Sequence, residues 1–283
     1  MVLVADSGST KTDWMIGGRV FSSPGINPVM MEGDAILSHI PSFQQEEVTE
    51  IFFYGAGCVK PFSERVEKAL RQVFPKIPIH VESDLLGAAR ALCGHQPGIA
   101  CILGTGSNTC LYDGQEIIDN IPPLGYILGD EGSGAVLGKL FLNKLFKREL
   151  PEALCDAFRQ WTPLTYTDIL DKVYRQPSAN RFLASLSPFI CQHVDEPVVN
   201  VMVYEHFNTF VRKNVMRYHR PDLPVSLVGG IAEHYRDILV NVLRANDLLV
   251  GEIIPHPIMR LTAYHSGAEE ELTGSGRKDS PVM

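Results

Sequence analysis

The chain has 283 residues, of which 45% are hydrophobic and 20% are charged. At about 150 residues per domain this length predicts two domains, and the composition is that of a globular protein, which excludes a mini-protein and a disordered chain. A formal net charge of -8 opposes binding to nucleic acids and anionic membranes, so neither is expected as a partner. Many of the 24 glycines fall in short clusters with Ser and Thr.

Two features concern the cellular compartment. We find no stretch of about 18 apolar residues that would span a membrane, and the first residues reach Asp6 without the segments of a secretion signal. We therefore expect a cytoplasmic protein. The six cysteines form no C-x-x-C motif and no zinc-type spacing with His, so we expect reduced and buried thiols.

Two segments show the same order of strand, turn and strand. Residues 1–5 are an apolar run, residues 6–13 are a polar turn, and residues 14–16 are apolar again. The pattern recurs at residues 99–103, 104–109 and 110–112. Apolar runs around Gly-rich turns predict hairpins, and their recurrence indicates an internal duplication.

Strands and helices alternate in the rest of the chain. Strands are expected at 51–54, 77–82 and 224–228, and helices at 62–74, 85–92, 132–146 and 232–244. This alternation predicts an α/β fold. The turn-rich segment 93–98 divides an N-terminal domain, 1–97, from a C-terminal domain, 98–283, with a mostly helical insertion at 151–219. The last helix is a candidate to pack back on the N-terminal domain.

The two glycine-rich turns are candidate phosphate-binding sites. Glycine leaves no Cβ in the way, so successive backbone N–H groups can converge on an anion. The first turn also carries Asp6, a carboxylate able to hold Mg²⁺ through water, and the cation of Lys11. The alternative is an ordinary hairpin turn. Neither a P-loop nor a Rossmann fingerprint is present.

Four motifs occur in a characteristic order: D-S-G-S-T-K-T at 6–12, G-T-G-S-N at 104–108, G-D-E-G-S-G at 129–134 and V-G-G at 228–230. Together they resemble the BadF/BadG/BcrA/BcrD ATPase family of the actin, sugar kinase and Hsp70 superfamily, whose best-known kinase members phosphorylate N-acetylglucosamine. The resemblance extends to about Gly267. It implies two ribonuclease-H-like domains, as in actin and hexokinase, with ATP in a cleft between them.

The resemblance implies a role for each motif. The phosphate-binding residues would be Ser7, Gly8, Ser9, Thr10, Lys11, Thr12, Gly104, Thr105, Gly106 and Ser107. Gly229 and Gly230 would contact adenosine, and Asp6 would hold Mg²⁺ through water. Ser7 and Ser9 stand where the family usually has glycine, although they still supply hydroxyl and amide donors.

Asp84 is the candidate catalytic base. It lies in the context S-D-L-L-G-A-A, where similar sugar kinases place the Asp that accepts the proton of the acceptor hydroxyl. Phosphoryl transfer requires mainly positioning and charge neutralisation, and a carboxylate can orient the hydroxyl. The alternative is that Asp84 only caps the following helix.

Sugar binding requires groups that pair with hydroxyls. Similar N-acetylglucosamine kinases use an Asn after the first strand pair, which corresponds to Asn27, and the Asp of the G-D-E-G-S segment with nearby backbone, which corresponds to Asp130 and Gly129. The alternatives are a turn role for Asn27 and a helix cap for Asp130. Asn108 either reaches the acetamido group or shapes its own turn.

The leading hypothesis is an ATP- and Mg²⁺-dependent amino-sugar kinase that converts N-acetylglucosamine to its 6-phosphate. A second hypothesis is an ATPase that drives a conformational change in a partner, like the dehydratase and reductase activators of this family. Those activators hold an iron–sulfur cluster through cysteines, and no plausible cluster ligands are visible here. A third is a non-catalytic nucleotide or sugar sensor. The family also suggests a homodimer through the helical second half.

Overall fold

The computed structural model describes residues 1–8, 10–43 and 48–267. Ser9, predicted to bind phosphate, lies outside the described residues, as do residues 44–47 and 268–283. The structure divides into two compact units. The first comprises Met1–Pro97, Tyr112–Ile117 and the chain from His256 onward, and the second comprises Gly98–Leu111 and Ile118–Pro255.

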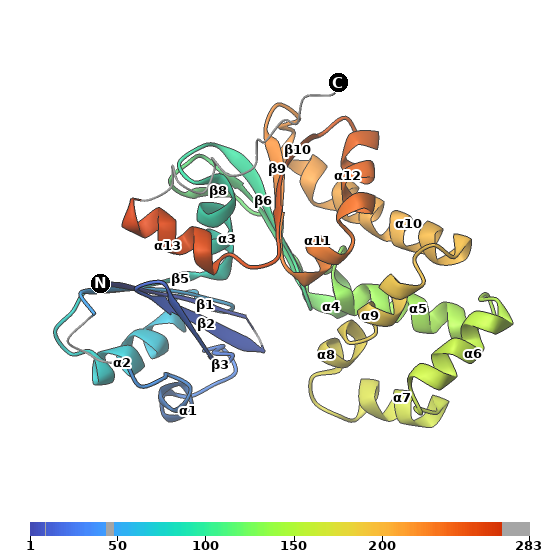
Figure 1. The fold of residues 1–283 in the computed structure, drawn as a ribbon, viewed down its shortest axis with the longest axis horizontal. Helices are drawn as coiled ribbons and strands as arrows, with labels where there is room; N and C mark the ends of the chain where they lie inside the picture. Colours follow the sequence, from blue (N-terminus) through green and yellow to red (C-terminus); the bar gives the residue numbers. More distant parts are fainter. Residues whose placement is uncertain (9, 44–47, 268–283) are drawn as a thin grey trace, which may run out of the picture. The chain divides into compact units, whose positions relative to one another are not determined.

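The first unit contains a five-stranded sheet in the order β3-β2-β1-β4-β5 (Figure 1). Its strands are β1 (Val2–Ser7), β2 (Lys11–Ile16), β3 (Arg19–Pro24), β4 (Glu50–Gly55) and β5 (Ile79–Ser83). β1, β4 and β5 are parallel, whereas β2 is antiparallel to both β1 and β3. The carboxyl ends of the three parallel strands therefore meet at one edge.

Alternation along the strands builds a core on each face of this sheet. Leu3 and Ala5 of β1 pack in a cluster with α2 (Ser63–Val73), and Val4 packs on the opposite face with α13 (Ile258–Ser266). Helices α1 (Gly33–Ser38) and α3 (Asp84–Cys93) complete the unit.

The second unit repeats this topology. Its sheet has the order β10-β9-β6-β7-β8, which reads β8-β7-β6-β9-β10 from the other edge. When the five strands of each sheet are numbered along the chain, both sheets therefore have the order 3-2-1-4-5. The strands are β6 (Gly98–Leu103), β7 (Ser107–Tyr112), β8 (Ile117–Asp119), β9 (Pro224–Val228) and β10 (Leu249–Ile254). β6, β9 and β10 are parallel. The strand order thus confirms the internal duplication.

Helices cover the second sheet, and several of them lie within 151–219, the segment predicted as a mostly helical insertion. The helices are α4 (Gly125–Leu128), α5 (Gly134–Phe146), α6 (Glu152–Trp161), α7 (Tyr166–Tyr174), α8 (Ala179–Ala184), α9 (Ser187–Gln192), α10 (Pro197–Lys213), a 3-10 turn (Val215–Tyr218), α11 (Gly230–His234) and α12 (Arg236–Ala245). One large apolar cluster joins them to the sheet. A Cβ at Gly138 would collide with the Leu183 carbonyl, so this glycine lets α5 and α8 pack closely.

Three sequence predictions need correction or extension. The single helix predicted over 232–244 is wrong, because Tyr235, whose hydroxyl donates to the Ser187 carbonyl, separates α11 from α12. The hairpin strands reach further into the turns than expected, to Ser7 and from Ser107. None of the six cysteines, all of which the structure describes, forms a disulfide, but Cys93 and Cys191 are only partly buried. Over the part of the chain that is described, no helix is long and apolar enough to span a membrane.

Candidate functional site

The carboxyl edge of the first sheet gathers the polar residues of the first unit. In the strand register, Ser7, Gly55 and Ser83 are neighbours at the ends of β1, β4 and β5. Asp6 and Asp84 lie at this edge, where ligands of open α/β sheets commonly bind. The predicted metal ligand and the predicted base therefore come from the ends of β1 and β5, the two strands that flank β4.

Asp84 is the first residue of α3 and does not cap it. The cap is Ser83, whose hydroxyl accepts the Leu86 N–H at 3.2 Å. Asp84 Oδ1 accepts the Leu85 N–H at 2.9 Å. Burial raises the pKa of Asp84 to about 6, against the opposing effect of this hydrogen bond. The carboxylate is thus ionised at neutral pH yet basic enough to accept a proton.

Asp6 lies opposite Asp13 in the β1–β2 register. Burial raises the pKa of Asp6 to about 7, helped by the charges of Asp84 and Asp13 and opposed by Lys11. The Lys11 Nζ lies 2.7 Å from Asp13 Oδ1. Several carboxylates thus share one nearby lysine, and such oxygen donors suit Mg²⁺. Among the described residues no three His, Cys, Asp or Glu are grouped as metal ligands, so any ion here would rely largely on water.

The first predicted phosphate turn divides into buried and exposed residues. Strand alternation turns Ser7 and Thr12 inward, where their hydroxyl oxygens lie 2.7 Å apart. Ser7 also bonds the Ile26 backbone at 2.9 and 3.1 Å, and Thr12 donates to the Pro24 carbonyl at 3.2 Å. These hydroxyls therefore fix the loop after β3.

Three other described residues of this turn face solvent. Gly8, Thr10 and Lys11 are exposed. The Gly8 N–H donates to the Lys11 carbonyl at 2.9 Å and closes the turn. A Cβ at Gly8 would meet only that carbonyl, at an ordinary 3.7 Å. The exposed side of the turn is thus formed by Gly8, Thr10 and Lys11.

Asn27 lies in the loop after β3, and its Oδ1 accepts the Val29 N–H at 3.0 Å. Gly57, with φ of +77°, approaches so closely that a Cβ there would lie 2.5 Å from this oxygen. The next residue, Cys58, is close enough to Asp84 that the carboxylate adds to the effect of burial, and together they raise the pKa of its thiol to about 12. The loop after β4 therefore lies close to both Asn27 and Asp84. Within the described chain the Asn27 Nδ2 has no hydrogen-bond partner.

The second predicted phosphate turn is held by α5. The N–H groups of Gly134 and Ala135 donate to the Gly104 and Thr105 carbonyls at 2.8 and 3.2 Å. The Gly104 N–H closes the turn on the Gly106 carbonyl at 2.9 Å. A Cβ at Gly104 would meet nothing within 4 Å. This face of the turn is open and could accept a ligand.

Asp130 joins this turn to the loop before α5. Its carboxylate accepts the backbone N–H groups of Ser107 and Gly125, and burial raises its pKa to about 6. Its backbone has a left-handed φ of 51°. The cap of α5 is Ser133, which accepts the Val136 N–H at 3.2 Å. Asp130 is therefore not the helix cap.

Contacts around Asp130 fix the loop further. A Cβ at Gly129 would collide with the Pro123 carbonyl, so this close approach requires glycine. The Ser107 hydroxyl donates to the Glu131 carbonyl at 2.7 Å, and Lys213 Nζ lies 2.8 Å from Glu131 Oε1. The loop and the turn are thus tied together at both the backbone and the side chains.

Asn108 follows the turn at the start of β7. Its Oδ1 accepts the Thr109 N–H at 2.9 Å and the Asn120 Nδ2–H at 3.0 Å. Both contacts are internal to the second unit. The structure therefore shows Asn108 shaping its own strand end, with its amide nitrogen left for other contacts.

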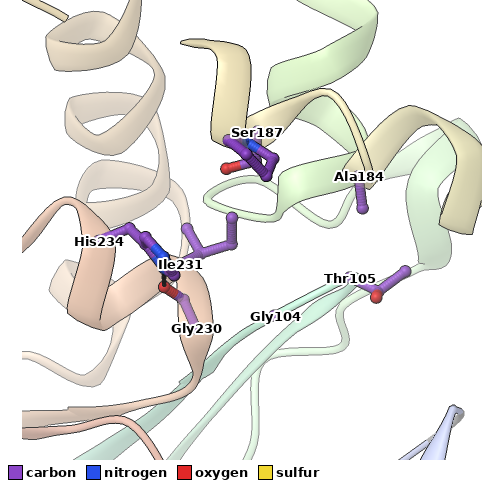
Figure 2. A pocket seen from close by; sticks show the side chains of 8 residues that line it. Gly104, Thr105, Ala184, Ser187, Gly230, Ile231 and His234 are labelled. Atoms are coloured by element: carbon purple, nitrogen blue, oxygen red, sulfur yellow. Dashed lines mark hydrogen bonds between the residues drawn. The ribbon is translucent and has the colours of Figure 1, made fainter. Parts of the chain in front are cut away.

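A pocket of about 340 Å³ opens in the second unit beside the second turn (Figure 2). It is lined by Gly104, Thr105, Ala184, Ser187, Pro188, Gly230, Ile231 and His234. Residues from two predicted motifs, G-T-G-S-N and V-G-G, therefore share one pocket. Gly106, Ser107 and Gly229 do not line it. Gly229, with φ of +124°, instead lets the end of β9 approach the Leu103 carbonyl.

The sequence did not indicate the other half of this pocket. Ala184, Ser187 and Pro188 come from the helical insertion, and Ile231 and His234 come from α11. Gly134 brings these parts together, because a Cβ there would lie 3.0 Å from Ile231 Cδ1 and 3.2 Å from Ala184 Cβ. A weak signal existed for His234, which lies four residues after Gly230 and thus on the same helix face.

Comparison with known proteins supports the fold. No protein-family model and no curated protein matches the sequence, so the narrower assignment to the BadF/BadG/BcrA/BcrD family stays a prediction. A solved structure of a candidate N-acetylglucosamine kinase from Porphyromonas gingivalis has 47% identity over 94% of this chain and 99% of that chain, with a TM-score of 0.92.

Two more distant structures show the fold alone. A candidate N-acetylglucosamine kinase from Chromobacterium violaceum has 20% identity over 93% of this chain and 97% of that chain, with a TM-score of 0.71. MreB5 of Spiroplasma citri, bound to AMPPNP, has 11% identity over 96% of both chains, with a TM-score of 0.55. These matches confirm the predicted α/β fold class of the actin and hexokinase type.

Proposed function

The chain belongs to the same family as the candidate N-acetylglucosamine kinase of Porphyromonas gingivalis, and we propose that it is an ATP-dependent sugar kinase. The proposed acceptor is an amino sugar, most directly N-acetylglucosamine, and the proposed product is the 6-phosphate. The observation that carries the proposal is Asp84, an acid with a pKa of about 6 at the carboxyl edge of three parallel strands.

In the proposed reaction Asp84 accepts a proton from the acceptor hydroxyl. The hydroxyl oxygen forms the new bond to the γ-phosphorus while the bond to the ADP oxygen breaks, and the hydroxyl proton passes to Asp84. Asp6 would hold Mg²⁺ through water, and the bound ion would neutralise phosphate charge. The shared carboxylates that raise the pKa of Asp6 are a donor set that fits this ion.

The remaining residues would bind the two substrates. The pocket of the second unit is of a size that suits part of a nucleotide, since ligand pockets begin at about 300 Å³. We propose that it takes the nucleoside, with the turn from Gly104 to Ser107 beside the phosphates. Gly8, Thr10 and Lys11 would contact the phosphates from the first unit. Asn27 and Asp130 would contact the sugar. Asn108 is a candidate to contact the acetamido group through its amide nitrogen.

An ADP-release assay over a panel of hexoses and amino sugars tests the proposal. We expect turnover that depends on an added amino sugar, and phosphorus-coupled NMR of the product should place the phosphate on O6. ATP hydrolysis without any sugar would instead support the partner-driving ATPase. Tight nucleotide or sugar binding without turnover would support a sensor.

The homodimer predicted from the family stays a proposal. Light scattering coupled to size-exclusion chromatography tests it directly. A mass of about twice the chain mass of 31.3 kDa would support it, and a monomer mass at assay concentration would contradict it.

A further inference from the structure

The polar groups of the second unit's pocket have a fixed hydrogen-bonding character. Three lining side chains carry polar atoms: Thr105, Ser187 and His234. The others are glycine or apolar side chains. Thr105 and His234 lie well apart in Figure 2. Because Thr105 belongs to the phosphate turn, Ser187 and His234 are left to face the base of a bound nucleoside.

The tautomer of neutral His234 follows from its backbone contact. Its Nδ1 bonds the carbonyl oxygen of Gly230, which can only accept, so Nδ1 carries the proton. In the neutral ring the other nitrogen, Nε2, then has a lone pair and no proton. In the described ranges no residue bonds Nε2. In this neutral form the ring offers the pocket a hydrogen-bond acceptor.

Tyr235 likewise fixes the hydrogen-bonding role of the Ser187 hydroxyl. The Tyr235 hydroxyl donates its one proton to the Ser187 carbonyl at 3.0 Å. Burial raises the pKa of this phenol, so it keeps that proton. At the second contact, 3.3 Å between the two hydroxyl oxygens, Ser187 is therefore the donor. The Ser187 proton is used within the protein, so towards a ligand this hydroxyl, on a pocket-lining residue that is 6% exposed, would act as an acceptor.

We infer that this pocket selects a 6-aminopurine nucleotide over a 6-oxopurine nucleotide, with His234 Nε2 and Ser187 Oγ as acceptors for the exocyclic amino group. An amino group donates to both atoms, whereas an oxo group presents lone pairs to lone pairs. A polar site rejects a ligand that leaves its groups unpaired more strongly than an apolar site does. The inference rests on the proposed function, because that function places a nucleoside here.

ADP and IDP are the matched probes, since they differ only in the groups at and next to position 6 of the base. Calorimetric titration of the whole chain with each ligand needs no turnover. We expect the wild type to bind ADP at least about tenfold more tightly than IDP, which corresponds to about 1.4 kcal/mol. His234→Phe keeps a ring without the acceptor, and Ser187→Ala removes Oγ while its carbonyl still accepts from Tyr235.

Each of these two substitutions should reduce the ratio of the IDP Kd to the ADP Kd by about threefold or more. His193→Phe is the control, because His193 makes the same contact through Nδ1 to the Phe189 carbonyl, at 2.9 Å, but does not line the pocket. It should leave both affinities unchanged. Equal binding of ADP and IDP by the wild type, or an unchanged preference in both pocket variants, would overturn the inference alone. Binding of neither ligand would overturn the proposed function with it.

Discussion

Replacing Asp84 by Asn should remove activity and stabilise the fold together. Asn keeps an oxygen that can accept the Leu85 N–H, so the start of α3 is preserved. It has no carboxylate to accept a proton. General-base contributions are about 10²–10⁴ in rate, and we expect kcat to fall by that factor while ADP binding is retained.

The stabilisation follows from the direction of the pKa shift. The pKa of Asp84 rises from 3.8 to about 6 on folding, so the native state holds this proton more tightly than the unfolded chain does. Stability from this group is therefore present below pH 4 and is lost as the pH rises through 6. If Asp84 were completely buried, this shift would lower the free energy of unfolding by about 3 kcal/mol. Because the residue is partly exposed, we expect a loss of about 1–2 kcal/mol.

Thermal unfolding of the wild type and Asp84→Asn between pH 4.5 and 8 measures this effect. The variant should melt about 2–8 °C higher at pH 7.5, and the difference should shrink towards pH 4.5. Loss of the Asp84 charge also removes one cause of the raised pKa of Asp6, and this should add to the stabilisation of the variant. Asp34→Asn, an exposed first-turn residue of α1, is the control and should not stabilise. A variant that retains turnover, or that melts lower at pH 7.5, would refute the reasoning.

Four further predictions concern the carboxyl edge of the first unit and the turn and pocket of the second unit. The kcat/KM of the wild type should fall below about pH 6, as Asp84 takes up its proton; a flat profile between pH 5 and 8 would contradict this. Gly104→Ala should melt like the wild type, because its Cβ enters open space, but should bind ADP at least about tenfold less tightly. Gly33→Ala, also at an open position, is its control. Asn27→Ala should raise KM for the sugar more than for ATP, and equal changes would argue against its assignment. Removal of Mg²⁺ with EDTA should abolish turnover while ADP binding to the second unit persists, as titration calorimetry would show.

The sequence predicted those elements that carry a strong periodic pattern. The hairpins β1–β2 and β6–β7 were expected because apolar runs flank their turns, and the shared strand order confirms the duplication. β3 was missed because nearly all of its residues are exposed and show no alternation. β10 was missed because Gly251 interrupts its apolar run.

The candidate site was predictable where residue type itself suggests chemistry. Gly104 and Gly230, predicted at the phosphates and at adenosine, both line one pocket, but Ala184 and Pro188 have side chains that indicate no function. Their contribution depends on how closely α8 packs on α5, which is a tertiary property. The hydroxyl of Ser7 was expected at the phosphate but points inward, because β1 continues through Ser7 and strand alternation sets its direction.

The two edges have the same topology but differ in their density of carboxylates. The first unit places Asp6, Asp13 and Asp84 around its turn with Lys11 as the neighbouring cation. Phosphate would be repelled there unless a divalent ion reversed the local field. The second unit presents the Gly104 turn and a pocket with no carboxylate among its lining residues, so it would need no metal to admit a nucleoside. Metal dependence should therefore belong to the transfer step, which brings phosphate to the acidic edge, and not to the first capture of the nucleotide.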